Sequence, residues 1–139
     1  MIYIADTAKV DDSVVLEDDA SVCGNAQVID KAKISDNAVV EGNAHVSGNA
    51  IVRGIACVFG RAYVGGNAQI SDNAHVCGNA EVLDNAKVEG QAWVSGNTVI
   101  RDHTLVSGDT RVYANSILEG DVTITSGRIK AVHWWKDIP

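Results

Sequence analysis

Aliphatic side chains recur along this chain at every sixth position, without insertion or deletion, from Val10 to Ile124. A second small residue lies two positions before each of them, Ala in most repeats and Thr, Ser or Val in the others. Because side chains two positions apart in a strand point to the same side, each repeat predicts a short strand with two inward-facing residues. A constant short period is typical of a solenoid, in which each repeat packs only against its neighbours.

Two turn-forming residues separate each predicted strand from the next. From Asp6 to Gly120 the first is always Gly or Asp, except at Ala114, and the second position holds every Asn in the chain. Asn is the non-glycine residue that best tolerates the left-handed backbone conformation, so we expect it to form the corner. A helical solenoid is disfavoured because a period of six matches no multiple of about 3.6 residues and β-branched residues are abundant. A hairpin array is disfavoured because the pattern never reverses after a turn.

The runs GNAHVSGNAIVRG and GNAQISDNAHVCGNAEVLDNAKVEG resemble the hexapeptide repeat of the left-handed parallel β-helix superfamily, which includes bacterial transferases. The resemblance extends over about residues 4–125. It implies an all-β fold, a single-stranded left-handed parallel β-helix that forms a triangular solenoid. Each of about seven coils would contain three repeats, or about 18 residues. At roughly 4.8 Å per stacked strand, the rod would be about 33 Å long.

The repeat ends near residue 125, which predicts a β-helix over residues 1–125 and a cap or docking tail over residues 126–139. The tail, SGRIKAVHWWKDIP, places Arg128 and Lys130 where the repeat requires small and aliphatic residues. Because open sheet edges need protection, we expect the tail to cap the rod or to dock on a partner. The residues that would do so are apolar: Ile129, Val132, Trp134, Trp135 and Ile138.

Composition agrees with one folded domain, since 46% of the 139 residues are hydrophobic and only 21% are charged. Three Cys without a CxxC pair argue against a disulfide framework and favour a reducing cytoplasm. The first residues lack the basic and apolar regions of a secretory signal. No apolar run approaches the roughly 20 residues that a membrane span requires. We therefore expect a cytoplasmic protein without a membrane segment.

The net charge of -7 argues against direct nucleic-acid binding, because phosphate contacts require a basic surface. Many of the 18 acidic residues occupy the first corner position, so much of the negative charge belongs to the turns. A rod that inhibits DNA-binding proteins by imitating an acidic duplex is a further alternative. The chain has the sign of charge for that function but not the density.

With about 18 residues per coil, residues 18 apart stack on one face of the predicted rod. All three Cys, the only Phe and the only Trp of the repeats fall on the same face. The apolar stripe predicted there consists of Val39, Cys57, Phe59, Cys77, Trp93 and Tyr113. Such a patch is typical of an interface. We predict that the stripe, with His75 beside it and Trp134 and Trp135 in the tail, binds a protein partner or a second copy. The resemblance implies a homotrimer with parallel rod axes.

His75 is the candidate catalytic residue, because the superfamily includes acyltransferases in which a His at a subunit interface acts as general base. The resemblance implies acetyl-CoA as cofactor for that activity, and His45, His103 and His133 match the role less well. Those enzymes usually extrude a loop from the coils to build the substrate pocket, and this repeat has no interruption. The main prediction is therefore a non-catalytic interaction or assembly protein without a cofactor. An acyltransferase acting at a trimer interface is the alternative.

Cys57, His75 and Cys77 are also residue types that bind Zn²⁺, and the register places them close together. A structural zinc site requires four ligands, and this spacing matches no zinc finger, so we expect no metal site. A Cys–His nucleophile is disfavoured because nothing in the sequence orients the His. The γ-class carbonic anhydrases need two metal-binding His about five apart, whereas neighbouring His are roughly 30 apart here.

Overall fold

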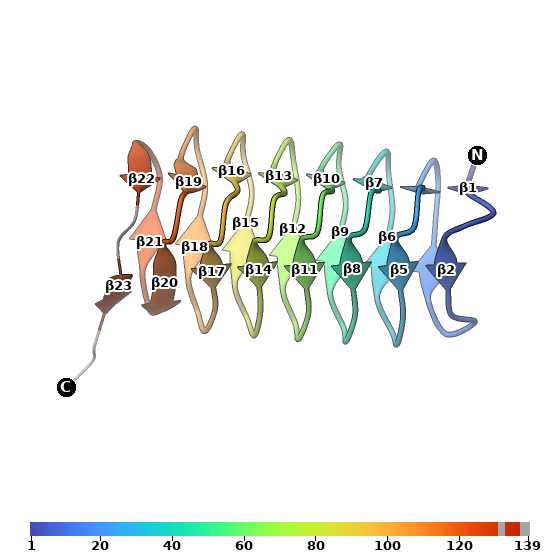
Figure 1. Ribbon diagram of the computed structural model, residues 1–139, viewed down its shortest axis with the longest axis horizontal. Coiled ribbons are helices and arrows are strands. Elements are labelled where there is room, and N and C mark those ends of the chain that lie inside the picture. The colour runs from blue at the N-terminus through green and yellow to red at the C-terminus, as the bar shows by residue number, and fades with distance from the viewer. Residues whose placement is uncertain (131–132, 137–139) are drawn as a thin grey trace.

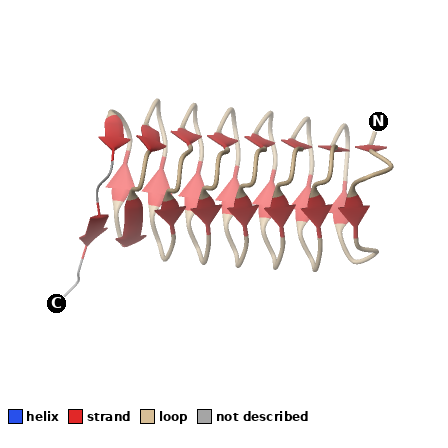
Figure 2. Ribbon diagram, viewed as in Figure 1, coloured by secondary structure: helices blue, strands red, loops and turns tan. Residues whose placement is uncertain are grey.

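The computed structural model describes the backbone of residues 1–130 and 133–136 and the side chains of residues 1–130. Every regular element in these residues is a strand (Figure 2). The chain winds into a rod of about seven coils (Figure 1), and three parallel sheets form its faces. The predicted triangular left-handed β-helix is thus confirmed.

Each coil contributes one short strand to each sheet. Sheet A contains β1 (Tyr3–Ile4), β4 (Ser21–Val22), β7 (Val39–Val40), β10 (Cys57–Val58), β13 (His75–Val76), β16 (Trp93–Val94), β19 (Arg111–Tyr113) and β22 (Arg128–Lys130). Sheet B contains β2 (Lys9–Val10), β5 (Gln27–Val28), β8 (His45–Val46), β11 (Tyr63–Val64), β14 (Glu81–Val82), β17 (Val99–Ile100), β20 (Ile117–Gly120) and β23 (His133–Lys136). Sheet C contains β3 (Val15–Leu16), β6 (Lys33–Ile34), β9 (Ile51–Val52), β12 (Gln69–Ile70), β15 (Lys87–Val88), β18 (Leu105–Val106) and β21 (Thr123–Ile124).

The core is a stack of identical layers. Val58 pairs with Val76, and Val76 pairs with Val94, so each aliphatic residue lies directly beside its counterpart in the next coil. The repeat Ala and aliphatic residues from Ala20 to Val94 are fully buried. Because burying one Val contributes about 1.5–3 kcal/mol, this interior column stabilises the rod and leaves only outward side chains for function.

The corners depart from the sequence prediction in one respect. Among the described residues, the left-handed backbone conformation falls on the first corner position, such as Gly24 at φ 61° or Asp30 at φ 62°, and never on Asn. The expectation that Asn adopts this conformation was wrong. Asn instead forms ladders: the Asn79 side chain donates to Asn97 at 3.2 Å, and Asn97 donates to Asn115 at 3.0 Å.

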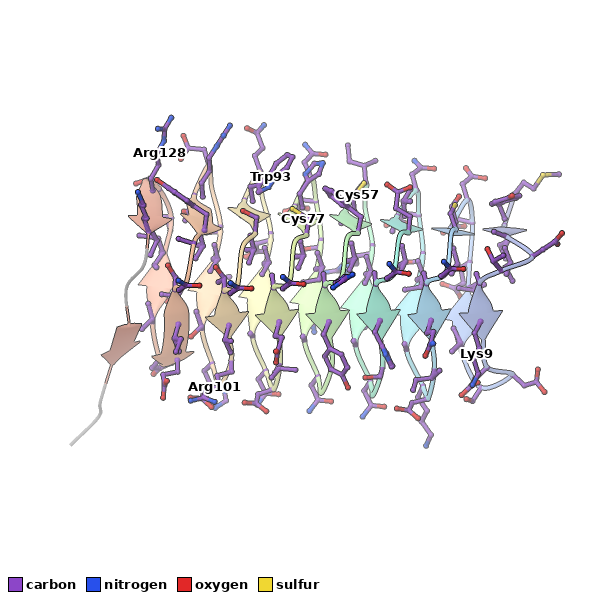
Figure 3. The ribbon with its side chains drawn as sticks, in the orientation of Figure 1. Lys9, Cys57, Cys77, Trp93, Arg101 and Arg128 are labelled. Carbon is purple, nitrogen blue, oxygen red and sulfur yellow. The ribbon has the colours of Figure 1, made fainter. Side chains whose placement is uncertain are left out.

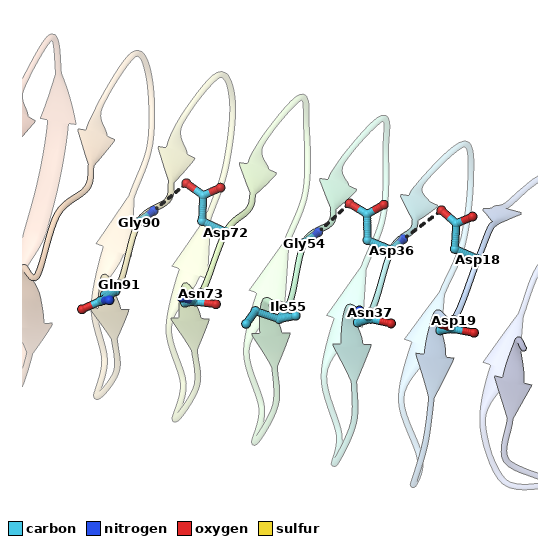
Figure 4. A pocket seen from close by; sticks show the side chains of 10 residues that line it. All are labelled: Asp18, Asp19, Asp36, Asn37, Gly54, Ile55, Asp72, Asn73, Gly90 and Gln91. Atoms are coloured by element: carbon cyan, nitrogen blue, oxygen red, sulfur yellow. Dashed lines mark hydrogen bonds between the residues drawn. The ribbon is translucent and has the colours of Figure 1, made fainter.

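Asp in the first corner position provides a hydrogen bond that Gly cannot make. The Asp36 carboxylate accepts from the backbone N–H of Gly54 at 3.0 Å, and Asp72 accepts from Gly90 at 3.1 Å (Figure 4). These corner N–H groups donate to no backbone carbonyl of the stacked coils, so the carboxylates satisfy them. Much of the acidic composition therefore has a structural role.

The tail continues two of the sheets along the rod. Strand β22 pairs with β19, and the coil between them is one residue shorter than the coils before it. Ile129 therefore lies beside Val112, where it is partly buried against the core. Strand β23 pairs with β20, so the backbone of Trp134 lies opposite Leu118.

The side chains of Trp134 and Trp135 lie outside the described residues, as do Val132 and Ile138. Their contact with a partner, and the division of the chain at residue 125, therefore stay predictions.

Candidate functional site

Sheet A gathers the residues of the predicted apolar stripe on one face. Its register places Val39, Cys57, His75 and Trp93 in one column. Trp93 is 38% exposed. Figure 3 shows Cys57, Cys77 and Trp93 along the same edge of the rod.

A neighbouring column carries the other stripe residues, each just after the buried aliphatic residue of its strand. Cys77 is buried there, whereas Phe59 and Tyr113 are half-buried. The two columns place these apolar residues on successive coils of sheet A, with Ser95 between Cys77 and Tyr113 in the second column.

An aromatic cluster lies at the centre of this stripe. The His75 and Trp93 rings stack with centroids 4.5 Å apart and planes 6° apart. Phe59 meets both rings edge-on, with centroids 6.3 Å from each. Since both edge-to-face and stacked contacts are favourable for aromatic rings, the cluster holds the imidazole in one orientation.

A backbone contact sets the tautomer of His75. Its Nδ1 lies 2.9 Å from the carbonyl oxygen of Asn73, which can only accept a hydrogen bond. The proton of the neutral ring therefore resides on Nδ1, and Nε2 is the basic nitrogen. No residue type in the sequence indicates this contact, because any residue at position 73 would supply the same carbonyl.

The cysteine thiols of the stripe are poorly suited to nucleophilic chemistry. Burial raises the pKa of Cys57 and of Cys23, and the nearby charge of Glu41 raises each further. Burial also raises the pKa of Cys77, against a smaller lowering by its hydrogen bond with Trp93. Thiolates are therefore scarce at neutral pH. Within the described residues, no group of three or more His, Cys, Asp and Glu is placed to hold a metal ion.

The other histidines lie apart from this cluster. The ring of His45 lies tilted against that of Tyr63 in sheet B, with centroids 4.9 Å apart and planes at 41°. Its Nε2 is buried without a hydrogen-bond partner in the described chain. His103 is exposed at a corner, and the side chain of His133 lies outside the described residues. Unlike His75, neither His45 nor His103 has a ring nitrogen hydrogen-bonded to a backbone carbonyl in the described chain.

A hollow of about 360 Å³ adjoins the aromatic cluster in the direction of the C-terminus. Its lining residues are Trp93, Ser95, Arg111, Tyr113 and Arg128. The sequence prediction missed both arginines as site residues. The place of Arg111 after Trp93 on the same face was a usable indication, whereas Arg128 is out of register with the repeat.

Larger hollows lie along the rows of stacked corner residues. One of them is lined by Asp18, Asp36 and Asp72, among other residues (Figure 4). Those carboxylates already bind backbone N–H groups of the next coil. No helix long and apolar enough to cross a membrane occurs in the described residues.

Comparison with known proteins adds to this picture. No protein-family model and no curated protein sequence matches the chain. Among solved structures, it is similar to the acetyltransferase domain of PglB from Neisseria gonorrhoeae FA1090, with a TM-score of 0.60 and 14% sequence identity. The chain has the hexapeptide-repeat β-helix fold. The similarity covers 88% of this chain and 53% of that structure, so this chain spans about half its length.

Proposed function

We propose that this β-helix protein is an acyltransferase in which His75 acts as general base. The observation that carries the proposal is the contact of His75 Nδ1 with the Asn73 carbonyl. This contact makes Nε2 the nitrogen that would take the substrate proton. Similarity of fold to an acetyltransferase domain supports this choice over an interaction protein without catalysis.

In the proposed reaction, Nε2 of His75 takes a proton from the amine or hydroxyl group of the acceptor. The acceptor nitrogen or oxygen attacks the thioester carbonyl of acetyl-CoA, forming a tetrahedral intermediate. The intermediate collapses by cleavage of the carbon–sulfur bond, and the departing thiolate receives the proton from His75. The products are the acetylated acceptor and free CoA, and the base is regenerated.

A second copy of the chain is part of the proposal. The backbone N–H groups around His75 are already used within sheet A, since His75 donates to Ala92 at 2.9 Å and Cys77 donates to Val94 at 2.8 Å. These two N–H groups are therefore not available to an oxyanion, and we propose that a second copy of the chain supplies the donor. Packing of a second copy on the apolar stripe would bring a hydrogen-bond donor close to His75 and exclude water from the site. The assembly would be a cytoplasmic homotrimer.

A non-catalytic interaction protein is the second candidate. It is favoured by the unbroken coils, which extrude no loop over the stripe, and by the exposure of Trp93 on it. In that case the stripe would bind a protein partner, and His75 would only pack against Trp93.

Activity with acetyl-CoA separates the two candidates. The wild-type protein is incubated with acetyl-CoA and a panel of amines and alcohols, and free CoA is measured by chromatography because the protein has three thiols of its own. His75→Gln is expected to lower kcat by about 100-fold or more. His103→Gln, an exposed corner histidine, is the matched control and should keep full activity.

Thermal unfolding of both variants shows whether the fold is retained. A His75→Gln protein as active as the wild type would overturn the role of His75. Absence of acetyl-CoA binding in calorimetry, together with no CoA release for any acceptor, would favour the interaction protein.

A further inference from the structure

Three cations lie next to the aromatic cluster on sheet A. Arg111 and Arg128 are register partners in adjacent coils, and Lys130 pairs with Tyr113 in the same two strands. All three basic side chains are exposed. They are three of only 11 Lys and Arg in a chain of net charge -7, so they make a local positive site on an acidic protein.

Neither arginine of this pair has an acidic partner among the described residues, unlike Lys33 and Arg101. Arg101 forms an ion pair with Glu119 at 3.0 Å, one coil further along sheet B. In the part of the chain that the structure describes, no ion pair joins Arg111 or Arg128 to a carboxylate. Asp109 lines an adjacent hollow with both arginines but lies beyond ion-pair distance of each.

The stacking of these arginines is electrostatically unfavourable by itself. Backbones of paired strands are about 4.8 Å apart, so two like charges are held close together in one column. The shortened final coil brings Arg128 into this place, because the spacing of the earlier coils would have put Ile129 beside Arg111. An anion bound between the two guanidinium groups would cancel their repulsion.

The lining of the hollow matches one class of anion well. Guanidinium groups bind phosphate oxygens in pairs, and the hydroxyl groups of Ser95 and Tyr113 can donate to the same oxygens. Trp93 packs one ring face on His75 and lines the hollow as well, which offers an aromatic surface to a planar base.

We propose that this hollow binds a nucleoside phosphate, with the phosphate groups on Arg111 and Arg128 and the base against Trp93. The site goes beyond the proposed acyl transfer, because it requires no proton transfer by His75. The same chemistry occurs in a free nucleotide and in the nucleotide portion of CoA, and the experiment below separates these two sources.

Calorimetric titration of the full chain with ADP, inorganic pyrophosphate, adenosine and CoA tests the site. We expect ADP to bind more tightly than pyrophosphate, and adenosine to bind too weakly to measure. Arg111→Gln and Arg128→Gln should each weaken ADP binding by about tenfold or more, and added salt should weaken it in the wild type. Arg53→Gln, an exposed arginine on sheet C, is the matched control and should bind as the wild type does.

His75→Gln should retain ADP binding, so failure of the catalytic proposal would leave this site standing. Binding of CoA at least about tenfold tighter than ADP would identify the nucleotide portion of the acyl donor as the natural ligand. Equal affinities would identify a free nucleotide. Equal binding of pyrophosphate and ADP would overturn the base contact, and ADP binding unchanged in the Arg111→Gln, Arg128→Gln double variant would overturn the site.

Discussion

His75 and Trp93 lie face to face in adjacent coils of sheet A, with ring centroids 4.5 Å apart. Because paired strands are about 4.8 Å apart, one column of the β-helix holds aromatic rings near their natural stacking distance without the help of a loop. The same Trp93 orients the candidate base and presents an exposed apolar surface. The proposed catalysis and the predicted self-association would therefore both depend on this pair of neighbouring strands.

Substitution of the stripe should change the oligomeric state. Phe59→Asp places a carboxylate in the centre of the apolar surface, which costs free energy when the surface is covered. We expect an assembled wild type and a monomeric Phe59→Asp protein in light scattering. Lys87→Asp, an exposed change on sheet C, should assemble normally. A monomeric wild type would contradict the predicted trimer.

The corner at Ala114 is expected to be strained. It has φ 65° without the glycine backbone or the carboxylate hydrogen bond of the other left-handed corners. Ala114→Gly should raise the free energy of unfolding by about 0.5–1 kcal/mol, because relief of the left-handed conformation outweighs the added entropy of the unfolded chain. The measurement is denaturant unfolding, with Ala92→Gly in the fully buried core as a control that should be destabilised. Loss of stability in Ala114→Gly would disprove the strain.

Two buried threonines should respond oppositely to the loss of their hydroxyl groups. Thr98 Oγ1 donates to the Ser95 carbonyl at 2.7 Å, whereas Thr104 Oγ1 is buried without a partner in the described chain. Thr98→Val should lower the free energy of unfolding by about 1 kcal/mol, and Thr104→Val should leave it unchanged or raise it. Denaturant unfolding measures both variants, and equal losses would show that the Thr104 hydroxyl is satisfied in solution.

Cysteine alkylation should report the folded state. Burial raises the pKa of Cys57 and Cys77 above the ordinary 9.0, so the folded protein holds fewer thiolates than the unfolded chain at the same pH. We expect slow reaction with iodoacetamide at neutral pH and rapid reaction in denaturant, followed by mass spectrometry. The contribution of the neutral thiols to the free energy of unfolding is fully present below pH 9.0, the ordinary thiol pKa. It is lost as the pH rises through the higher pKa of the folded state. Rapid alkylation of the folded protein at neutral pH would contradict the assigned burial.

The sequence was sufficient for the fold and for the columns of outward residues. The period of six, together with the three repeats per coil that the family resemblance implies, placed His75 beside Trp93 and Cys57. It misassigned the left-handed corner to Asn, since propensity alone does not show which corner residue faces the next coil. A Cβ added at Gly96, for example, would lie 2.6 Å from the Ala114 carbonyl oxygen.

The sequence by itself determined the short stacked strands and their Ala and Val interior, because a periodic pattern specifies which residues point inward. The resemblance to the hexapeptide-repeat family added the three sides of the rod and the place of the apolar stripe on one of them. Only the tertiary structure decided how the site is arranged. The Nδ1 contact of His75 depends on a backbone carbonyl at Asn73, whose position no side-chain pattern encodes. The pairing of Arg111 with Arg128 arises from a final coil one residue short, where packing of Ile129 on the core, rather than the count of six, sets the register.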